Sequence, residues 1–555
     1  MKLSFYLSAI LLIVACLLPN HYVPWLASHS EFTAIAVAFF LLIAIFIDKN
    51  KIEYPKFFLI FPIIACIPLL QWGGGLIFFF GDAFMASAYL FIFFALLVIG
   101  FYIGKNQTIR EPVIYGFCLS ILFIAVVSIF IALKQWLLLT NGGIWIADLP
   151  PGARPFANFG QPNTLSTFLL MGFAASLYMY EKKKIQLLTF IFLFTFIILG
   201  VALTQSRTAW IAIPCLVAYW LYKSNSIRFH FTKFKILTVI AVFIFFINVV
   251  PWFSAVIGVV DIENIAERAS TGHNRFYLWQ QMLLAIQNQP WFGYGWGQVG
   301  VAQVEITPLL PFQEWITHSH NILLDILIWN GIPIGILIIV VSSIWIFYLL
   351  FTANSLETVI LSLMVIAILV HAQFEYPLEY SFFLVPLGFM LGFIHSEKET
   401  IYLFVINRFS LVSAMIFSIV LYLLVFNEYR IAEKDVQLAR FQLLNIGNVK
   451  TEQAAPNLII LTQLREQLRF MRTEPEKNMT EEQLKWMKKV AYRYATASAL
   501  HRYAQALALN NQPELAKKHL RIIKQLHGKD YSFNSLTEKR YSLAFEWKNK
   551  DISKL

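Results

Sequence analysis

Basic side chains and histidines stand in a few polar segments between long apolar stretches, and their types point to the binding of an anion. Arginine's planar guanidinium binds phosphate at two points, and a histidine at a membrane boundary can act as a general base near neutral pH. These residues are Arg154, Arg207, Arg268, Arg275, His318 and His320. Together they predict a site for an anionic, membrane-embedded substrate; scattered surface charge is the alternative.

The longest polar segment extends over about 253–321. Apolar residues within 276–286 recur at helical spacing, which predicts an amphipathic helix at the membrane surface. Asn274 is a good N-cap residue, and Arg275 would then lie in the first turn, where the helix dipole disfavours a cation. Binding of an anion there would resolve this conflict. An arginine solvated at the interface is the alternative.

The same segment ends in two further elements. The aromatic and glycine run Trp291–Gly297 predicts either a sugar-stacking surface or, by slight preference, an interfacial anchor. Thr317–Asn321 follows directly before an apolar stretch and places His320 at the boundary as a candidate base; a structural capping histidine is the alternative. His318 and His320 could bind zinc with Glu314, but their spacing is not a metal signature, so we expect no metal or other cofactor.

Three shorter segments also carry polar residues. Ser206 and Arg207 lie in a tight turn between two apolar stretches. The segment Pro151–Asn163 is too rich in Pro, Gly and Asn to be helical and predicts an ordered re-entrant or interfacial loop that carries Arg154. His371–Leu378 lies where two apolar stretches end, at a depth where ionisable residues are usually functional or paired.

The elements that must position these residues are membrane helices. The chain is 58% apolar and 14% charged, with a mean hydropathy of +0.65, well beyond the composition of a water-soluble domain. We predict an all-α polytopic membrane domain over 1–427 and a soluble helical domain over 428–555. The expected spans are 5–19, 32–47, 57–71, 83–103, 113–133, 163–180, 185–203, 208–222, 236–252, 322–351, 357–372, 381–395 and 409–426, and the tenth could hide a break.

Charge orients these thirteen spans. The net charge is +11, but 23 of the 43 Lys and Arg lie between Arg430 and Lys554 and most others in short loops, so we expect no nucleic-acid partner. One set of alternate loops holds fifteen basic residues and the other only five, which places the first set in the cytoplasm. The outer set consists of Lys134, Arg154, Arg207, Arg268 and Arg275. We therefore expect a multi-pass inner-membrane protein with its site and C-terminal domain in the periplasm of a Gram-negative cell.

The C-terminal domain appears in the sequence as amphipathic helices near 458–470 and 481–500. A helix pair over His501–His527, with a turn at Asn510–Pro513, is similar to one tetratricopeptide unit. We expect it to serve in recognition or packing rather than catalysis. The four cysteines all lie in apolar stretches, which is typical of small buried side chains.

In their order along about 150–380, these motifs resemble the O-antigen ligase/polymerase superfamily (the WaaL and Wzy class). Within it they are most similar to bacterial protein O-oligosaccharyltransferases of the PglL type. The motifs are the Arg154–Asn163 loop, Ser206-Arg207, Arg275 with Trp279, Pro290–Gly297, His320-Asn321 and Glu375–Leu378. His371–Leu378 and the soluble tail favour the protein-glycosylating branch.

The resemblance implies a GT-C-like membrane fold and a donor of oligosaccharide linked to undecaprenyl diphosphate. It also implies that His320 is catalytic and that Arg207 and Arg275, with Arg154, engage the diphosphate. The acceptor would be a Ser or Thr of a type IV pilin or another periplasmic protein, and direct displacement would invert the anomeric carbon. Candidates for the acceptor or sugar site are His318, Asn321, Asn163, Glu375 and Tyr376.

Three other functions remain open on the sequence. An O-antigen ligase or O-antigen polymerase would use the same donor with another acceptor. A transporter or flippase would have a similar number of helices, but it usually places polar residues near the bilayer midplane, whereas these spans are almost uncharged. A scaffold anchored by the helical tail would tolerate loss of His320 and of both diphosphate arginines.

Overall fold

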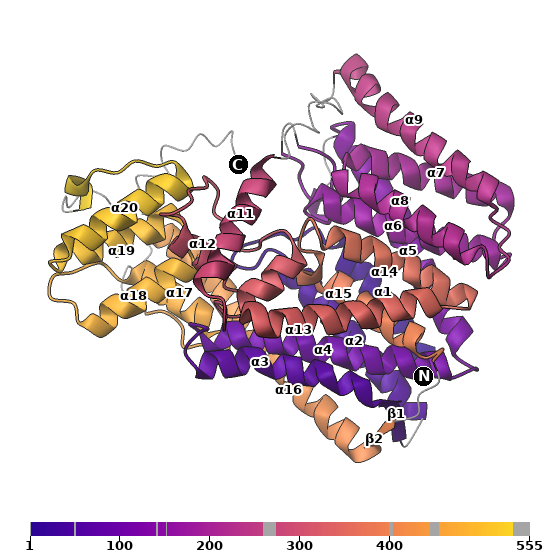
Figure 1. Cartoon of the computed structure of the whole chain (residues 1–555), viewed down its shortest axis with the longest axis horizontal. Coiled ribbons are helices and arrows are strands. Elements are labelled where there is room, and N and C mark those ends of the chain that lie inside the picture. The colour runs from indigo at the N-terminus through magenta and orange to yellow at the C-terminus, as the bar shows by residue number, and fades with distance from the viewer. Residues whose placement is uncertain are drawn as a thin grey trace. The chain divides into compact units, whose positions relative to one another are not determined.

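The computed structural model describes residues 2–48, 51–139, 143–150, 153–258, 273–398, 403–443 and 454–536. They belong to two compact units, which are considered separately (Figure 1). Unit 1 comprises 1–62, 90–271 and 342–419, and unit 2 comprises 63–89, 272–341 and 420–555. Arg268 lies outside the described residues.

Each of the thirteen predicted spans coincides with a helix. These helices are α1 (Lys2–Leu17), α2 (Ser28–Asp48), α3 (Ile60–Gly73), α4 (Phe80–Lys105), α5 (Arg110–Trp136), α6 (Pro162–Glu181), α7 (Leu187–Thr204), α8 (Arg207–Lys223), α9 (Lys233–Ile257), α13 (Ile322–Thr352), α14 (Leu356–His371), α15 (Ser381–His395) and α16 (Arg408–Leu443). In unit 1, α6 packs against α5, α7, α8 and α14, and α6, α7 and α8 lie side by side in Figure 1. α16 continues past residue 427, so the predicted domain boundary falls inside one helix.

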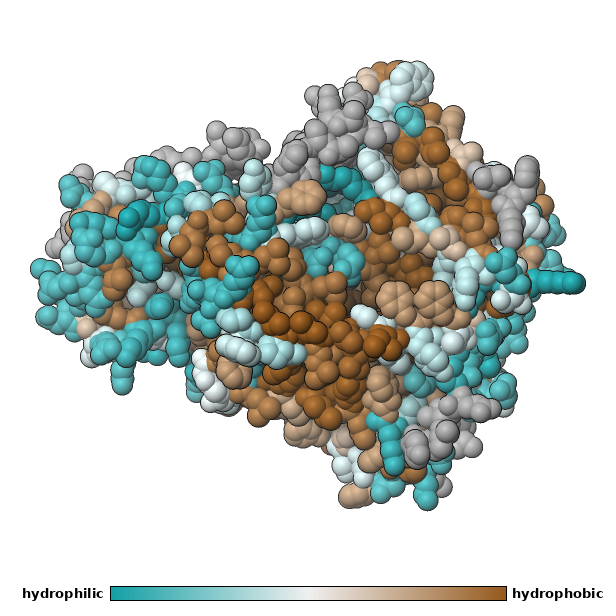
Figure 2. Space-filling view, viewed as in Figure 1, coloured by the Kyte–Doolittle hydropathy of each residue, from teal (hydrophilic) through white to brown (hydrophobic). Residues whose placement is uncertain are grey.

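The chain is a multi-pass membrane protein. Among the described residues, eight helices are long and apolar enough to cross a bilayer. Figure 2 shows hydrophobic residues exposed over α13, where Leu337 and Ile344 are more than 60% exposed. Such an apolar surface suits lipid and not water. Crossing by all thirteen helices remains a prediction.

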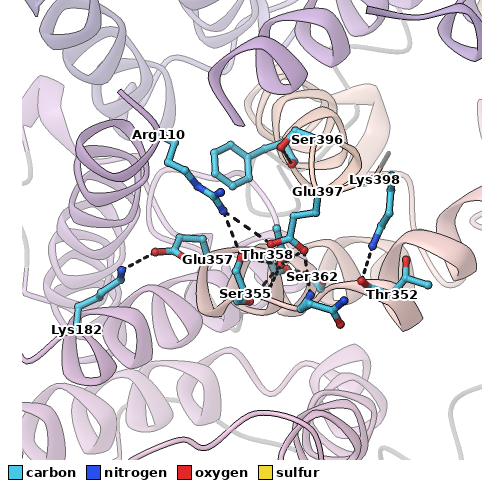
Figure 3. A network of polar contacts seen from close by, with 12 residues as sticks. Arg110, Lys182, Thr352, Ser355, Glu357, Thr358, Ser362, Ser396, Glu397 and Lys398 are labelled. Atoms are coloured by element: carbon cyan, nitrogen blue, oxygen red, sulfur yellow. Dashed lines mark hydrogen bonds and ion pairs between the residues drawn. The ribbon is translucent and has the colours of Figure 1, made fainter. Parts of the chain in front are cut away.

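Ion pairs join the helix ends that the charge bias assigns to the cytoplasm (Figure 3). Lys182 after α6 pairs with Glu357 at the start of α14, with 2.6 Å between Nζ and Oε1. Arg110 at the start of α5 lies 3.8 Å from the carboxylate of Glu397, which follows α15. The charge count over alternate loops placed these four segments on the cytoplasmic side. They meet at one end of unit 1, which supports their assignment to the same side of the membrane.

A two-stranded sheet corrects the all-α prediction. β1 (Lys51–Pro55) pairs antiparallel with β2 (Leu403–Asn407), with Glu53 opposite Val405. The two segments follow α2 and precede α16, and the charge count put both on the cytoplasmic side. Backbone pairing between segments this far apart has no signal in local periodicity, so the sequence could not reveal it.

The tenth span contains the break that its length suggested. Gly331 interrupts α13 with φ 73° and ψ 177°, a conformation essentially confined to glycine. The carbonyls that lose their helical partners at the break accept hydrogen bonds from the aromatic and glycine run: Tyr294 N–H donates to Ile328 O (2.7 Å) and Gly295 N–H to Trp329 O (3.1 Å). The run therefore satisfies backbone groups at the break, as a membrane helix requires. Trp291, at its start, is 70% exposed, as expected of an anchor.

Substitution Gly331→Ala should destabilise the protein by at least about 2 kcal/mol, because a side chain there is strained and its Cβ would lie 2.4 Å from Trp291 O. The apparent Tm in detergent measures this. The control Gly116→Ala, in mid-α5, meets no atom within 4 Å and should not lower Tm. Equal Tm values for the two variants would contradict the role given to the break.

The C-terminal helices of unit 2 share a hydrophobic core with the polar segment that precedes α13. They are α17 (Thr462–Arg472), α18 (Glu481–Arg493), α19 (Ala497–Leu509) and α20 (Pro513–His527). Val301 and Val304 of α12 (Val299–Ile306) enter the core of these helices, and Arg493 pairs with both carboxylate oxygens of Asp82 at 2.8 and 3.0 Å. The predicted helix pair and its turn are confirmed. The predicted run 481–500 is instead two helices, because Thr496 caps α19.

Candidate active site

The Arg154 loop of unit 1 is ordered from Ala153 to Gln161, as predicted. Pro162 and Asn163, which the sequence placed in the loop, are instead the first residues of α6, and Pro151 and Gly152 lie outside the described residues.

Gln135 of α5 holds this loop: its side-chain oxygen accepts from the N–H groups of Phe156 (3.1 Å) and Ala157 (2.8 Å), and its Nε2 donates to Ala157 O. Asn158 donates to Leu17 O at 2.7 Å. Side-chain amides thus supply the hydrogen-bond partners that the N–H and C=O groups of this backbone would find within a helix. The loop can therefore be irregular and still be buried.

The turn that carries Arg207 is held by contacts from this loop and from the start of α6. Gln205 ends α7 with φ 48°, and Ser206 is the N-cap residue of α8, so Arg207 is the first helical residue. Ser206 makes no side-chain cap; its hydroxyl donates to Asn163 Oδ1 at 2.8 Å instead. A cation in the first turn opposes the helix dipole, the conflict that the sequence predicted for Arg275.

Arg154 braces the same turn. Its Nη1 donates to Thr204 O (3.1 Å) and to Gln205 O (3.3 Å), at the C-terminus of α7, where the dipole favours a cation. These bonds direct at least one guanidinium nitrogen to the backbone. They support a role for Arg154 in positioning Arg207. This role would either add to the predicted contact of Arg154 with the substrate or replace it.

Asn163 also connects the turn to the segment after α14. Its Nδ2 donates to Glu375 Oε1 at 3.0 Å, so one amide links Ser206 to Glu375. Gln161 donates to the hydroxyl of Tyr376 beside it. Burial raises the pKa of Tyr376, and the bond from Gln161 opposes that rise only in part. The phenol therefore stays neutral near pH 7 and can serve in hydrogen bonding but not as a base.

In unit 2, His320 occupies a left-handed backbone conformation with φ 58°, uncommon for a residue other than glycine. Both neighbours are anchored. Ser319 is fully buried and its hydroxyl donates to Asn321 O (2.8 Å). Asn321 caps α13, since its Oδ1 accepts from the N–H groups of Leu323 (2.9 Å) and Leu324 (3.1 Å). These contacts give Asn321 a structural role, and its predicted contact with the acceptor or sugar stays a prediction.

Two residues hold Ser319 from either side. Asp325 of α13, itself buried, accepts the Ser319 N–H at 2.8 Å, and Trp279 donates its indole N–H to Ser319 O at 3.0 Å. Trp279 belongs to α11 (His273–Asn288), the predicted amphipathic helix. Arg275 is one turn before Trp279 and so lies on the same face of α11, toward the His320 segment.

Two predictions concern the start of α11 and the grouping of the histidines with Glu314. α11 begins at His273, so Asn274 is inside the helix and is not its N-cap as predicted. Among the described residues, Glu314, His318 and His320 do not form a group that could hold a metal. Local spacing was sufficient to predict the helix but not its first residue, because helical periodicity does not mark where a helix begins.

The structure therefore brings the predicted residues together as two sets. One, in unit 1, joins Arg154, Asn163, Arg207, Glu375 and Tyr376; the other, in unit 2, joins Arg275, His318, His320 and Asn321. Sequence reasoning missed the residues that hold them, chiefly Gln135, Gln161 and Asp325. Of these residues, only Asp325 could have been noticed in the sequence, because it lies in the first turn of α13. An acidic residue at that position is ordinarily explained by its favourable interaction with the helix dipole.

Replacing Asp325 by Leu should lower kcat at least about tenfold with little change in the KM for the expected lipid-linked donor, because the buried Ser319 N–H would lose its acceptor and the His320 backbone its anchor. Asp325→Asn keeps a side-chain oxygen at the same position and should retain most of kcat. If Asp325→Leu keeps normal kcat, or if the Asn variant fails equally while its Tm is unchanged, the positioning role is wrong.

Comparison with known families agrees with a membrane-bound ligase. A family model described as O-antigen ligase matches residues 190–340, which include Arg207, Arg275 and His320. A model described as protein glycosylation ligase matches 155–180, the segment that contains Asn163. A third, described as the C-terminal part of a virulence factor membrane-bound polymerase, matches 359–541.

Similarity to individual proteins extends over nearly the whole chain. A general O-oligosaccharyltransferase of Acinetobacter baylyi is 33% identical over 543 residues, 96% of this chain and 94% of that protein. A ComP-specific O-oligosaccharyltransferase of the same species is 30% identical over 489 residues, 86% of each chain. The chain therefore belongs to the protein O-oligosaccharyltransferase family of glycosyltransferases. The resemblance inferred from its motifs is confirmed, and the transporter and scaffold alternatives are set aside.

Proposed function

We propose that the protein transfers an oligosaccharide en bloc from undecaprenyl diphosphate to a Ser or Thr hydroxyl of a periplasmic protein, with His320 as the base. The observation that carries this proposal is the conformation of His320. The left-handed backbone of His320 is strained, and Ser319 and Asn321 hold it from both sides. Strained backbone conformations of this kind cost conformational free energy and cluster at functional sites. Arg207 and Arg275 are assigned to the donor diphosphate, and both lie in the first turn of a helix.

The chemistry balances without a further reactant. The acceptor oxygen forms a bond to the anomeric carbon as the bond from that carbon to the diphosphate oxygen breaks, which inverts the configuration. The hydroxyl proton passes to the imidazole of His320, and undecaprenyl diphosphate leaves with the electron pair. Since a diphosphate is a good leaving group, the arginines need only stabilise the charge that develops on it.

In this proposal the arginines, and not a metal ion, stabilise the negative charge on the leaving diphosphate. We therefore expect a chelator such as EDTA to leave the rate of transfer by purified enzyme unchanged, and added Mg²⁺ or Mn²⁺ not to raise it by more than about twofold. A rate that falls with EDTA and returns with one of these ions would contradict metal independence.

The acceptor is the part of the proposal that varies among relatives, since one is named as general and another as specific for ComP. We propose a type IV pilin or another periplasmic protein as the acceptor, with the site and the C-terminal helices on the periplasmic side of the inner membrane. Mass spectrometry of pilin from cells with and without the protein tests this. Loss of the pilin glycan with intact O-antigen is expected; loss of O-antigen alone would favour an O-antigen ligase or polymerase.

A further inference from the structure

α12 is a short helix of unit 2 that is buried on two of its sides. Val301 and Val304 belong to the core of the C-terminal helices. Val299 and Ala302 belong instead to a second core, which also contains residues of α11 and of the first half of α13. The segment that carries His320 leads directly into α13. α12 is therefore packed between the C-terminal helices and two helices that adjoin the candidate base.

Gln303 of α12 braces the irregular segment 307–321, which joins α12 to α13. Its side chain is fully buried, and its Nε2 donates to Glu314 O (2.8 Å) and to Gln281 Oε1 (3.2 Å). Its Oε1 accepts from Ile316 N–H at 2.9 Å. Gln281 of α11, also fully buried, donates to Leu310 O at 2.7 Å. Two amides thus supply partners that this backbone cannot find within a helix.

The bonds of this amide lie close to the candidate base along the chain. Ile316 is four residues before His320, and Ser319 is held by Asp325 and Trp279. The stretch that presents the imidazole is therefore anchored at both ends, with two residues between the anchors. A reacting group that is misplaced by about 1 Å can lose about 10²-fold in rate, so a change in the path of this stretch should be felt in the chemical step.

We propose that Gln303 is a positioning residue for His320, which it serves by fixing the backbone of 314–316; this inference rests on the proposed function above. The amide is fully buried and both of its polar atoms are bonded to the protein, so it acts through the backbone and not on the substrate. Since α12 itself packs on the C-terminal helices, these helices share in holding the active site.

The test replaces the amide in the full-length protein purified in detergent. Gln303→Met has nearly the same size but removes all three bonds, so kcat should fall at least about tenfold. The KM for the lipid-linked donor should change by less than about twofold, because the lost contacts do not involve the donor. Both constants are measured at a temperature well below the Tm of every variant.

Asn510→Leu is the matched control, because Asn510 braces another irregular segment of unit 2, 473–480, with the same set of bonds. Its Oδ1 accepts from Met479 N–H (2.8 Å), and its Nδ2 donates to Glu476 O (2.7 Å) and to Ala506 O (2.8 Å). This segment does not lead to His320. We expect Asn510→Leu to lower Tm, as Gln303→Met also should, but to keep kcat within about twofold of the unmodified protein.

Gln303→Glu should restore activity in a pH-dependent way. A neutral carboxyl group can donate to Glu314 O and accept from Ile316 N–H, as the amide does. Burial raises the pKa of the introduced carboxyl group, and above that pKa a carboxylate would face the oxygens of Glu314 and Gln281 without a proton between them. The ratio of its kcat to that of the unmodified protein should therefore fall as the pH rises from about 5 to about 9. Taking the ratio at each pH removes the titration of His320, which both proteins share.

Three results would overturn the proposal: an unchanged kcat in Gln303→Met, equal losses of kcat in Gln303→Met and Asn510→Leu, or a Gln303→Glu variant as impaired as Gln303→Met at every pH. A failure of the proposed function is seen separately, because it would leave His320→Asn with near-normal kcat. A failure of the positioning role alone would leave His320→Asn impaired and Gln303→Met active.

Discussion

Replacing His320 by Asn should lower kcat by about two to four orders of magnitude, the range usual for loss of a general base. Asn is the informative substitution because it tolerates the left-handed backbone that His320 adopts, with φ 58°, yet it cannot take up a proton. The measurement is transfer of glycan from lipid-linked donor to acceptor peptide by purified enzyme at saturating donor.

Two comparisons separate chemistry from folding. The Tm of His320→Asn should match that of the unmodified protein, whereas His320→Ala should lower both Tm and kcat, since alanine is strained at this position. His318→Asn, two residues away, should reduce kcat by less than about tenfold. An Asn variant with near-normal kcat and Tm would show that His320 is not the base.

Arg207→Ala should lower kcat/KM for the donor by about two to three orders of magnitude, as expected when a preorganised charge on a leaving group is removed. Arg207→Lys keeps the charge but not the planar two-point contact, so we expect an intermediate loss of about tenfold or more. Donor affinity, measured separately by binding, should fall in both variants.

Arg154 is the matched comparison, since it lies at the same turn but bonds to the backbone carbonyls of Thr204 and Gln205. Arg154→Met should reduce both Tm and donor affinity, because the turn that presents Arg207 loses its brace. If Arg207→Ala leaves donor affinity unchanged, the diphosphate role is wrong. A normal Tm with a large loss of affinity in Arg154→Met would instead favour direct contact of Arg154 with the donor, as the sequence predicted.

The sequence was sufficient to predict the apolar helices and the residues that could do chemistry. Thirteen apolar runs became thirteen helices, and the helix of Arg275 and the ordered loop of Arg154 were expected. A break in the tenth run was considered, but its position at Gly331 was not predicted. These features depend on local hydropathy, on helical spacing and on residues such as glycine and proline. Such properties act between near neighbours along the chain, so they can be recognised without knowledge of the fold.

The sequence did not reveal what holds those residues. Gln135 supports the Arg154 loop and Asn163 supports the Arg207 turn, while Asp325 and Trp279 anchor the His320 segment. Each of these contacts depends on how the chain packs. A buried amide or carboxylate takes whichever partner the packing brings within hydrogen-bonding distance, and neither spacing nor composition specifies that partner.

The polar character of the site was therefore determined by the sequence alone: arginines and a histidine between apolar helices, with an excess of basic residues in the alternate loops. Only the tertiary structure assigned these residues different tasks. It made Asn321 a helix cap, turned a nitrogen of Arg154 toward the backbone, and gave His320 its left-handed conformation. Residue type sets what a side chain can bind, and the fold selects which of those partners it meets.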